Sequence, residues 1–304
     1  AKERVRITHS TTSASGRPFV ASRFVAELPD AVPVETIATS IDTQQRETLA
    51  QLHVFTPDHE RELKEYLKLR LEHYTMSVTH LNNYLECPRL WYYRNLLRAP
   101  AAKTKHMSFG TAVHAALFDL LGQDARSKKY LVDRFNSHLD REVLIPADRK
   151  ASVVLGKDVL GAYFDRYQKS FVPALSRELN FASHGVRLAD LPLTGMLDKV
   201  EEVDAKAKLV NVVDYKTGNP DGKSAALKPG GAYHRQLVFY QLLADTSKRF
   251  NHTMVSGEID FVQASKRTGK FVKLKIEIDS AQVDELSEQI KEVWADIKKM
   301  AFLD

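Results

Sequence analysis

The chain has 304 residues, 43% of them hydrophobic, and Lys and Arg outnumber Asp and Glu by 44 to 39. This length suits one sizeable domain with an appendage, or two modest domains, and a net charge of +5 permits a polyanionic partner without requiring one. The single cysteine, Cys87, excludes disulfides within the chain and any all-cysteine zinc or iron–sulfur site. It also fits a reducing compartment, so a cytoplasmic location is expected. No apolar run is long enough to span a membrane, and we expect no membrane partner.

The N-terminal part of the chain holds only short patterned segments. It begins with AKERVRITHS, without Met and inside a strand-like alternation over residues 4–8, which indicates a piece cut from a longer polypeptide. A short helix is predicted over residues 18–28, after a polar loop, and the weak patterning of residues 30–58 predicts a connector. From Asp58 onward, the sequence HERELKEYLKLRLEHY has helical spacing with charges on one side.

Four further helices are predicted before the apolar pattern changes. Ser77 is expected to cap the helix SVTHLNNYLEC, which Pro88 interrupts, and the aromatic-rich segment LWYYRNLL follows. A strongly apolar helix is predicted over residues 108–122, from a Ser-Phe-Gly-Thr start to a closing glycine. Helical spacing then continues over residues 128–138 and 153–179.

After residue 179 the apolar period changes from helical to two. This change predicts the strands VRLADLPL, TGMLDKVEEV and KLVNVVDYKT, and later SGEIDFVQ and FVKLKIEI. Helices are predicted over residues 233–250, between these strands, and over residues 281–300, at the end of the chain. An α/β fold is therefore expected, with a central mixed β-sheet flanked by helices and a helical N-terminal half.

The predicted strand 208–217 ends in charged residues on an apolar face. Residues two apart in a strand share a face, so Asp214 and Lys216 lie on one side, and Asp198 projects from the preceding strand. Neighbouring carboxylates repel unless a cation lies between them, and their oxygens suit Mg²⁺, Mn²⁺ or Ca²⁺. A lysine beside them could stabilise negative charge in a transition state. If the Asp-x-Lys pair stood alone, an ordinary salt bridge would be the preferred interpretation.

Two predicted helices add polar residues to apolar faces. His114 lies on the core-facing stripe of the helix 108–122, where a lone histidine is usually buried and hydrogen-bonded. Gln236 and Tyr240 are four residues apart and share one face of the helix 233–250. Taken alone, they indicate only an ordinary helix with a polar spot.

The order of these motifs resembles the RecB-like branch of the PD-(D/E)xK nuclease superfamily. The matching segments are SVTHLNNYLECPRLWYYRNLL, GTAVH, LTGMLDKVE, VVDYKTG and GGAYHRQLVFYQLL, which together span about residues 75 to 245. The resemblance implies a restriction-endonuclease-like core. It also implies that Mg²⁺ or Mn²⁺ is bound by His114, Asp198, Asp214 and the backbone carbonyl of Tyr215.

The same resemblance assigns further roles. Lys216 would be the catalytic lysine, and Gln236 and Tyr240 would hold the DNA strand or order the site. Glu178 lies upstream of the G-x-x-D motif and matches an acidic position of the family only loosely, so a surface glutamate is an equally good interpretation.

Cys87 bears on a variant of the family. Some relatives hold an iron–sulfur cluster with a cysteine before the proline of this helix and three more near the C-terminus. Cys87 stands at that first position, but no other cysteine exists, so no iron–sulfur cluster is expected. We therefore predict that Cys87 is a small buried residue packed near Trp91 and Tyr92.

A phosphate-binding loop is not expected. Residues 218–224 end in GKS after a strand, but three residues separate the glycines where the pattern needs four, and Pro229 breaks the following helix early. The basic stretch AALKPGG, residues 225–231, is interpreted as a loop near the DNA path, and a merely solvated loop is the simpler alternative.

The N-terminal sequence resembles the end of the second motor domain of a UvrD-like helicase, through AKERVRIT and SRFVAEL. The last ATPase motif would precede residue 1, so this chain is expected to have no ATPase activity of its own. We predict a motor-domain remnant over residues 1–30, a connector with a helix over 31–74 and a RecB-like nuclease domain over 75–304.

Together these features predict a metal-dependent DNase of a helicase–nuclease, which acts in DNA repair or recombination and hydrolyses phosphodiester bonds, with single strands or ends of DNA as the favoured substrate. The alternatives are a catalytically silent DNA-binding module of the same fold and a nuclease that acts alone. The presence of each expected site residue argues against the first, and the motor-like N-terminus argues against the second. Exonuclease or endonuclease action, cleavage polarity and partner subunits stay open.

Overall fold

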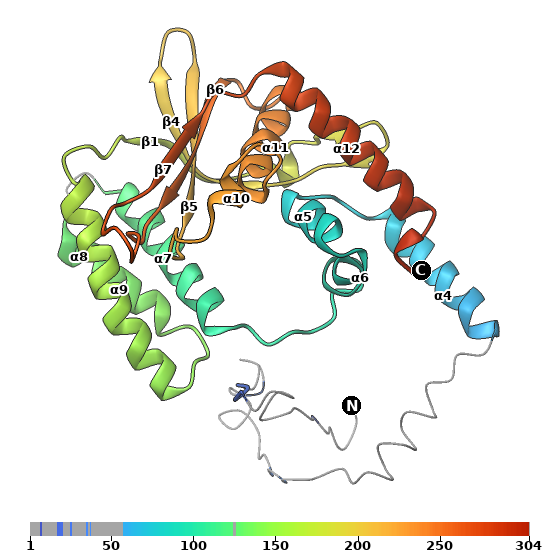
Figure 1. The fold of residues 1–304 in the computed structure, drawn as a ribbon, viewed down its shortest axis with the longest axis horizontal. Coiled ribbons are helices and arrows are strands. Elements are labelled where there is room, and N and C mark those ends of the chain that lie inside the picture. Colours follow the sequence, from blue (N-terminus) through green and yellow to red (C-terminus); the bar gives the residue numbers. More distant parts are fainter. Residues whose placement is uncertain are drawn as a thin grey trace. The chain divides into compact units, whose positions relative to one another are not determined.

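The computed structural model describes residues 57–123 and 126–303, together with the isolated positions 7, 17–20, 25, 35 and 37. It divides into two compact units, Ala1–Tyr74 and Thr75–Asp304. In the first unit, α4 (Pro57–Glu72) confirms the helix predicted from Asp58 (Figure 1). The strand predicted over residues 4–8 and most of the helix predicted over 18–28 lie outside the described residues.

The second unit is built on a five-stranded sheet with the order β1-β4-β5-β6-β7. Its strands are β1 (Ala174–Asn180), β4 (Met196–Asp204), β5 (Leu209–Lys216), β6 (Thr253–Phe261) and β7 (Lys273–Ile276). Only the β5–β6 pair is parallel among these neighbours, and the other three pairs are antiparallel. The sheet is therefore mixed, because α11 (Ala232–Thr246) carries the chain back across it between the two parallel strands.

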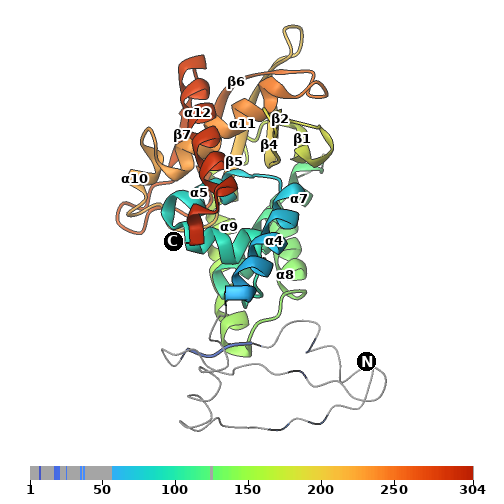
Figure 2. The ribbon, with the colours of Figure 1, turned by 90° about the vertical axis from the view of Figure 1, so that its right-hand side faces the viewer.

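Helices cover both faces of this sheet (Figures 1 and 2). On one side are α7 (Lys105–Leu121), α8 (Lys128–Leu139) and α9 (Pro146–Tyr167), and α11 packs on the other. The remaining described elements of the unit are α5 (Val78–Glu86), α6 (Pro88–Trp91) with a π-helical turn (Tyr92–Leu96), the short hairpin β2 (Arg187–Leu188) and β3 (Leu191–Pro192), α10 (Ser224–Leu227), α12 (Ser280–Lys298), and the 3₁₀ turns Phe181–Ser183 and Ala301–Leu303. The expected α/β architecture is confirmed.

The strand period divides the residues of β5 between two environments. Val213 and Tyr215 join the apolar core formed with α7, α8 and α9. Asp214 points to the opposite side, where Tyr240 of α11 donates a hydrogen bond to it. Both faces of β5 are buried, which is why its sequence is apolar almost throughout.

Two helix boundaries differ from the sequence prediction. The apolar helix α7 begins at Lys105, with Thr104 as its N-cap, so Ser108 lies buried inside it and does not open it. The helix predicted over residues 153–179 is wrong at both ends, because α9 spans Pro146–Tyr167 and residues 174–180 form β1. Pairing with β4 draws this last segment into the sheet, and that long-range contact leaves no clear mark on the local apolar period.

The predicted burial of Cys87 is wrong. Its side chain is exposed at the junction between α5 and α6, where Ser77 caps α5 as predicted and Pro88 starts the next helix. Trp91 does lie in the core, with its ring 5.1 Å from that of Phe302. The backbone is extended at Cys87, between α5 and α6. The cysteine side chain is exposed there, while Trp91 of α6 is buried.

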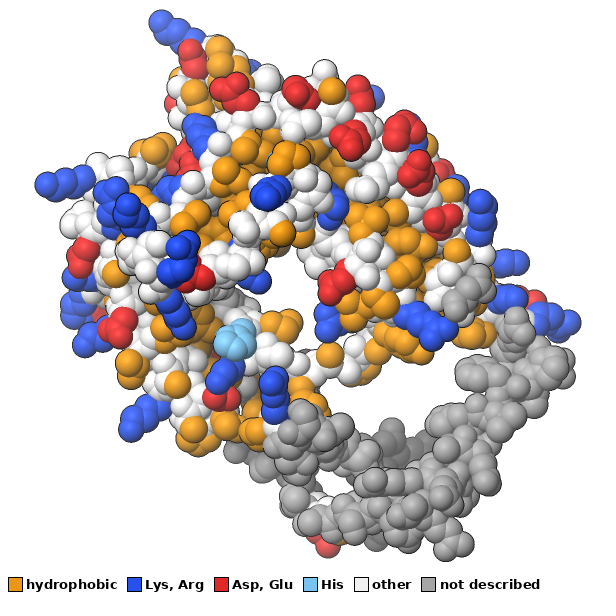
Figure 3. Space-filling model, viewed as in Figure 1, with side chains coloured by type: hydrophobic (Ala, Val, Ile, Leu, Met, Phe, Trp, Pro, Cys, Tyr) orange, Lys and Arg blue, Asp and Glu red, His pale blue; other side chains and the backbone are white. Residues whose placement is uncertain are grey.

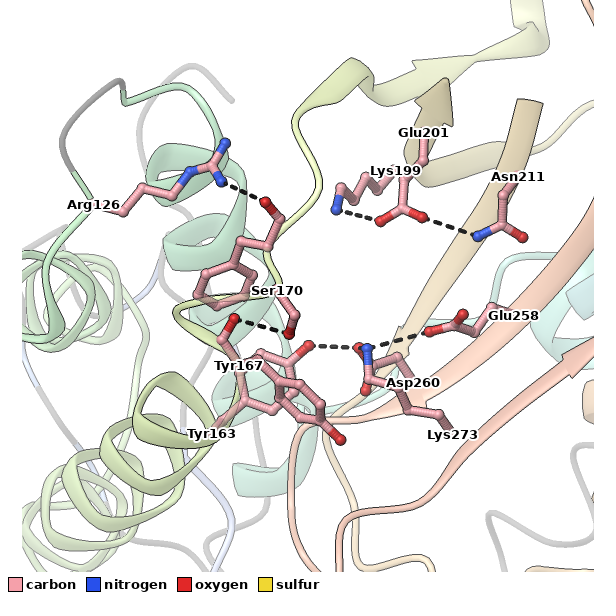
Figure 4. Close-up of polar contacts among 11 residues, drawn as sticks. Arg126, Tyr163, Tyr167, Ser170, Lys199, Glu201, Asn211, Glu258, Asp260 and Lys273 are labelled. Carbon is pink, nitrogen blue, oxygen red and sulfur yellow. Dashed lines mark hydrogen bonds and ion pairs between the residues drawn. The ribbon is translucent and has the colours of Figure 1, made fainter. Parts of the chain in front are cut away.

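A closed polar network lies between the sheet and α9 (Figure 4). Tyr163 of α9 donates a hydrogen bond of 2.5 Å to Asp260 Oδ2, and Lys273 Nζ lies 2.6 Å from the same oxygen. Lys273 also contacts Glu258 at 3.2 Å and stacks over the ring of Tyr167. We call this set of five residues the inner network, and it ties α9 to β6 and β7.

A second buried ion pair lies on the same face, across β4 and β5 (Figure 4). Lys199 Nζ is 2.5 Å from Glu201 Oε1, and Asn211 donates to the other oxygen of Glu201 at 3.0 Å. Ser256 on β6 completes the chain with a hydrogen bond to Asn211. Burial lowers the pKa of Lys199, although Glu201 opposes the shift. Among the described helices, none is both long and apolar enough to cross a membrane.

Candidate active site

A cavity of about 440 Å³ opens where β4, β5, α7 and α11 converge. It brings together all the site residues that the sequence predicted, although they are spread over more than a hundred positions. Those that line the cavity are His114, Asp198, Asp214, Tyr215, Lys216, Gln236 and Tyr240.

Asp214 is the most deeply buried carboxylate of this cavity, with 3% of its surface exposed. Its Oδ1 accepts hydrogen bonds from Gln236 Nε2 at 2.7 Å and from Tyr240 OH at 2.9 Å. Its Oδ2 lies 2.7 Å from Lys216 Nζ, as an ion pair, and accepts no hydrogen bond from the described residues. Burial raises the pKa of Asp214, Lys216 opposes this shift, and the charge of Asp198 adds to it.

Asp198 approaches from the neighbouring strand β4. Its Oδ2 accepts a hydrogen bond from the backbone N–H of Tyr215 at 2.8 Å and lies 3.3 Å from His114 Nδ1. Burial lowers the pKa of His114, but the hydrogen bond to Asp198 and the charges of Asp198 and Asp214 outweigh burial and raise it. The histidine therefore lies beside two carboxylates at the cavity wall, partly exposed, and does not point into the apolar core as its helical stripe predicted.

Lys216 ends β5 and is held from three sides. Besides the ion pair with Asp214, its Nζ donates to Gln236 Oε1 at 2.6 Å and lies 4.8 Å above the ring of Tyr233. Gln236 also donates to Tyr240 OH at 2.6 Å. The amide of Gln236 thus contacts Lys216, Asp214 and Tyr240, and it orders these three side chains relative to one another.

Two glycines allow these elements to approach closely. A Cβ at Gly195, the residue just before β4, would lie 2.7 Å from a methyl carbon of Leu243 on α11. A Cβ at Gly110 of α7 would lie 3.2 Å from Thr217 Oγ1, just after the end of β5. A side chain at Gly110 would require Thr217 to shift by a few tenths of an ångström, and one at Gly195 would require the end of the flexible Leu243 side chain to move.

The donor set fits a hard divalent cation. Asp198 and Asp214 supply carboxylate oxygens, His114 supplies an imidazole nitrogen, and the only described partner of the buried Asp214 Oδ2 is Lys216. Lys216 balances the charge in this arrangement. Within residues 57–123 and 126–303, no three His, Cys, Asp or Glu side chains are spaced so that they could hold a metal ion as they stand, so these residues would have to move to bind a cation.

Some lining residues were not singled out in the sequence. Thr217 and Thr79 face the cavity, and Ser77, predicted only as a helix cap, also lines it. The position of Thr217 directly after the Asp-x-Lys pair was the available signal. Glu178 has an exposed side chain on β1, a backbone φ of 47°, and no place in the cavity lining.

Comparisons with known proteins give one matching family and several matching solved structures. Fifteen chains of solved structures match; one, titled "Crystal structure of SSO0001", is 17% identical, with a TM-score of 0.33 over 76% of this chain and 84% of that chain. A comparison with curated proteins gives no match. The family model described as "PD-(D/E)XK nuclease superfamily" matches residues 75–303, which include the whole sheet and every residue of the cavity. The chain belongs to the PD-(D/E)XK nuclease superfamily.

Proposed function

We propose that this chain is a Mg²⁺- or Mn²⁺-dependent deoxyribonuclease of the RecB-like branch, which hydrolyses phosphodiester bonds of single-stranded DNA or DNA ends. The observation that carries the proposal is the convergence of Asp198, Asp214 and Lys216 in an open cavity, where Asp214 Oδ2 is buried and accepts no hydrogen bond from a described residue. A pocket lined by a carboxylate whose pKa is raised by burial is the arrangement expected of a catalytic site.

His114, Asp198 and Asp214, with the Tyr215 carbonyl, would hold the metal. When bound, a divalent cation supplies a water of lowered pKa and polarises the scissile phosphate. This chain's own residues orient the reaction: Lys216 places positive charge where the transition state gains negative charge.

Two residues of α11 keep that constellation in place. Gln236 holds Lys216 through its carbonyl oxygen and Asp214 through its amide nitrogen, and Tyr240 donates to the same carboxylate. Fixed donors of this kind need not reorganise during the reaction, which is the main source of electrostatic catalysis.

The wider setting rests on the N-terminal resemblance. We propose that residues 1–30 are the end of a helicase motor domain, that 31–74 connect it to the nuclease domain of residues 75–304, and that the full-length polypeptide acts in DNA repair or recombination. A motor would feed one strand to the cavity, so DNA should be bound mainly through its phosphates, without base specificity and with steep salt dependence.

The test is cleavage of end-labelled and of circular single-stranded DNA, with Mg²⁺, Mn²⁺ or excess EDTA. We expect cleavage only with the divalent cations and none by an Asp214→Asn variant. Full activity in excess EDTA contradicts the metal-dependent mechanism. DNA binding without any cleavage under all conditions instead identifies the chain as a catalytically silent binding module.

A further inference from the structure

Two loops meet where the inner strands β5 and β6 end, next to the cavity. The loop after β5 covers residues 217–223, and the turn between β6 and β7 covers residues 262–272. Because β5 and β6 are parallel, both segments leave the sheet at the same end, directly after Lys216. A hydrogen bond of 2.9 Å from Val262 N to Lys216 O keeps them together at their base. We call these two segments the loop pair.

Asp221 clamps the loop pair. Its Oδ1 accepts a hydrogen bond from Ser265 Oγ at 2.6 Å, and its Oδ2 accepts from the backbone N–H of Arg267 at 3.1 Å. Asn219 adds a longer contact of 3.4 Å from Lys266 N to its Oδ1. The hydrogen bond from Ser265 is the main reason why the pKa of Asp221 is lowered, so this carboxylate stays ionised and holds both loops.

The turn between β6 and β7 is itself rigid. Ser265 is buried, and its hydroxyl and carbonyl oxygens accept hydrogen bonds from the backbone N–H groups of Thr268 and Gly269. Gly269 has a φ of 68°, which a residue with a side chain rarely adopts. The turn is therefore shaped before any partner arrives.

The loop pair presents cations that have no carboxylate partner. Lys223, Lys266, Arg267 and Lys270 are exposed, and none makes an ion pair with a described residue. Asp221 is the one carboxylate in the two segments, and both of its oxygens are taken up by the loops. The loop pair therefore carries four exposed cations and one carboxylate, Asp221, whose oxygens already accept hydrogen bonds within the loops.

Some other surface cations of the second unit are paired, although Lys206, Lys208 and Lys248 are also exposed and form no ion pair with a described residue. Lys103, Lys105 and Lys128, for example, each contact a carboxylate, at 2.6, 3.3 and 2.6 Å respectively. On the face drawn in Figure 3, Asp and Glu side chains gather along α12 at upper right, and Lys and Arg side chains are spread over the left-hand side among a few acidic ones.

We propose that the loop pair is a preformed ledge that binds the phosphate backbone of the nucleic acid strand leading into the cavity. Exposed Lys and Arg side chains without a carboxylate partner are well suited to bind phosphate oxygens. Such contacts do not depend on the sequence of the bases. The inference rests on the proposed deoxyribonuclease function, because it assigns a binding surface to the substrate of that same cavity.

The test compares two triple variants with equal loss of charge. The loop variant is Lys266→Ala/Arg267→Ala/Lys270→Ala. The control is Lys206→Ala/Lys208→Ala/Lys248→Ala, whose exposed cations lie around the opposite ends of β5 and β6. Fluorescence anisotropy with a labelled single-stranded oligonucleotide, in EDTA to prevent cleavage, gives the affinity across a salt series. We expect the loop variant alone to bind about ten-fold more weakly, with a salt slope lower by about 2, at about 0.7 for each lost phosphate contact.

A second variant separates shape from charge. Asp221→Ala makes the loop pair more positive, so charge alone predicts tighter binding. If the ledge depends on the hydrogen bonds of Asp221, the variant should bind DNA more weakly, because the loops lose their fixed geometry. Tighter binding by this variant would overturn the preformed ledge.

Hydrolysis of bis(p-nitrophenyl) phosphate with Mn²⁺ distinguishes failure of this inference from failure of the proposed function. This small phosphodiester reaches the cavity without needing the ledge, so the loop variant should hydrolyse it at the wild-type rate while cleaving long DNA more slowly. If the loop variant keeps wild-type DNA affinity and salt slope while the wild type cleaves DNA, the ledge is wrong and the nuclease stands, leaving an acidic protein as the partner of these loops. If the wild type cleaves neither substrate with any divalent cation, the proposed function itself fails.

Discussion

The cavity and the inner network are two charged clusters on opposite faces of one sheet, and they differ in access more than in composition. Each contains a buried aspartate paired with a lysine, Asp214 with Lys216 and Asp260 with Lys273. Burial raises the pKa of both aspartates, and each has one oxygen with no hydrogen bond from a described residue.

What separates the two clusters is what covers them. Asp260 is 1% exposed and lies beneath Tyr163, whose ring packs against Tyr167 and Phe271. Asp214 is almost as buried, at 3% exposed, but it lines an open cavity. A perturbed carboxylate therefore marks a candidate catalytic group only where substrate can reach it, and the same chemistry under a helix serves to hold the fold.

The sharpest way to break this comparison is the Asp214→Asn variant. We expect DNA cleavage to fall by more than about 1,000-fold, because the substitution removes a charge that we propose to bind the metal and to act in the reaction. The free energy of unfolding should change little, since the ionised form of Asp214 is disfavoured by burial. Cleavage rates and thermal unfolding of the same preparation check both expectations. Retained cleavage would remove Asp214 from the mechanism.

The Lys216→Ala variant tests whether metal binding and catalysis depend on different residues of the cavity. We expect turnover to fall by several hundred-fold, about the loss seen when one transition-state donor is removed, while Mn²⁺ still binds. Titration calorimetry with Mn²⁺ is the measurement, with Asp214→Asn as the matched variant that should lose affinity. Equal loss of Mn²⁺ affinity in both variants would make Lys216 a part of the metal site.

Asp260→Ala tests the covered cluster. It leaves the ammonium of Lys273 and the hydroxyl of Tyr163 buried without their shared partner, so the free energy of unfolding should fall by about 3 kcal/mol. Cleavage per folded molecule should stay within about two-fold of the wild type, since transition-state contacts are untouched. Urea unfolding and active-fraction assays give the two numbers. A large loss of turnover in a folded variant would show that the inner network acts on the cavity.

The smallest expected effect comes from a partly exposed cluster between α7 and α8. Asp119 accepts hydrogen bonds from Arg134 at 2.6 Å and His138 at 2.7 Å. Burial works against the ionised form, but these two partners outweigh it and lower the pKa of Asp119 below its usual 3.8. A depressed carboxylate pKa stabilises the fold above the unfolded value, and that contribution disappears as the pH falls through the folded pKa.

At neutral pH, Asp119→Asn should therefore cost about 1 kcal/mol or less, in keeping with a solvent-screened pair. The urea midpoints of the wild type and the variant should converge as the pH is lowered below about 4, the region where an ordinary aspartate protonates. A difference that persists unchanged in acid would mean that the asparagine alters packing and not charge.

Much of this protein follows from local patterns in its sequence. The period of two over residues 208–217 places Asp214 and Lys216 on one face, Ser77 caps its helix through a contact three residues away, and the order of short motifs predicts the superfamily that the family comparison shows. Such features depend on residues close together in the chain, where backbone geometry alone determines which side chains are neighbours.

The tertiary structure decided what lies between distant segments. Gln236 and Tyr240 reach Asp214 across 22 and 26 positions, the Asp221–Ser265 hydrogen bond spans 44, and Tyr163 meets Asp260 across 97. The same cause explains the errors over β1 and Cys87, because strand pairing and chain bends are set by packing against other elements. Local periodicity can assign a side chain to a face, but only the packed fold determines whether that face meets solvent, a helix or another charge.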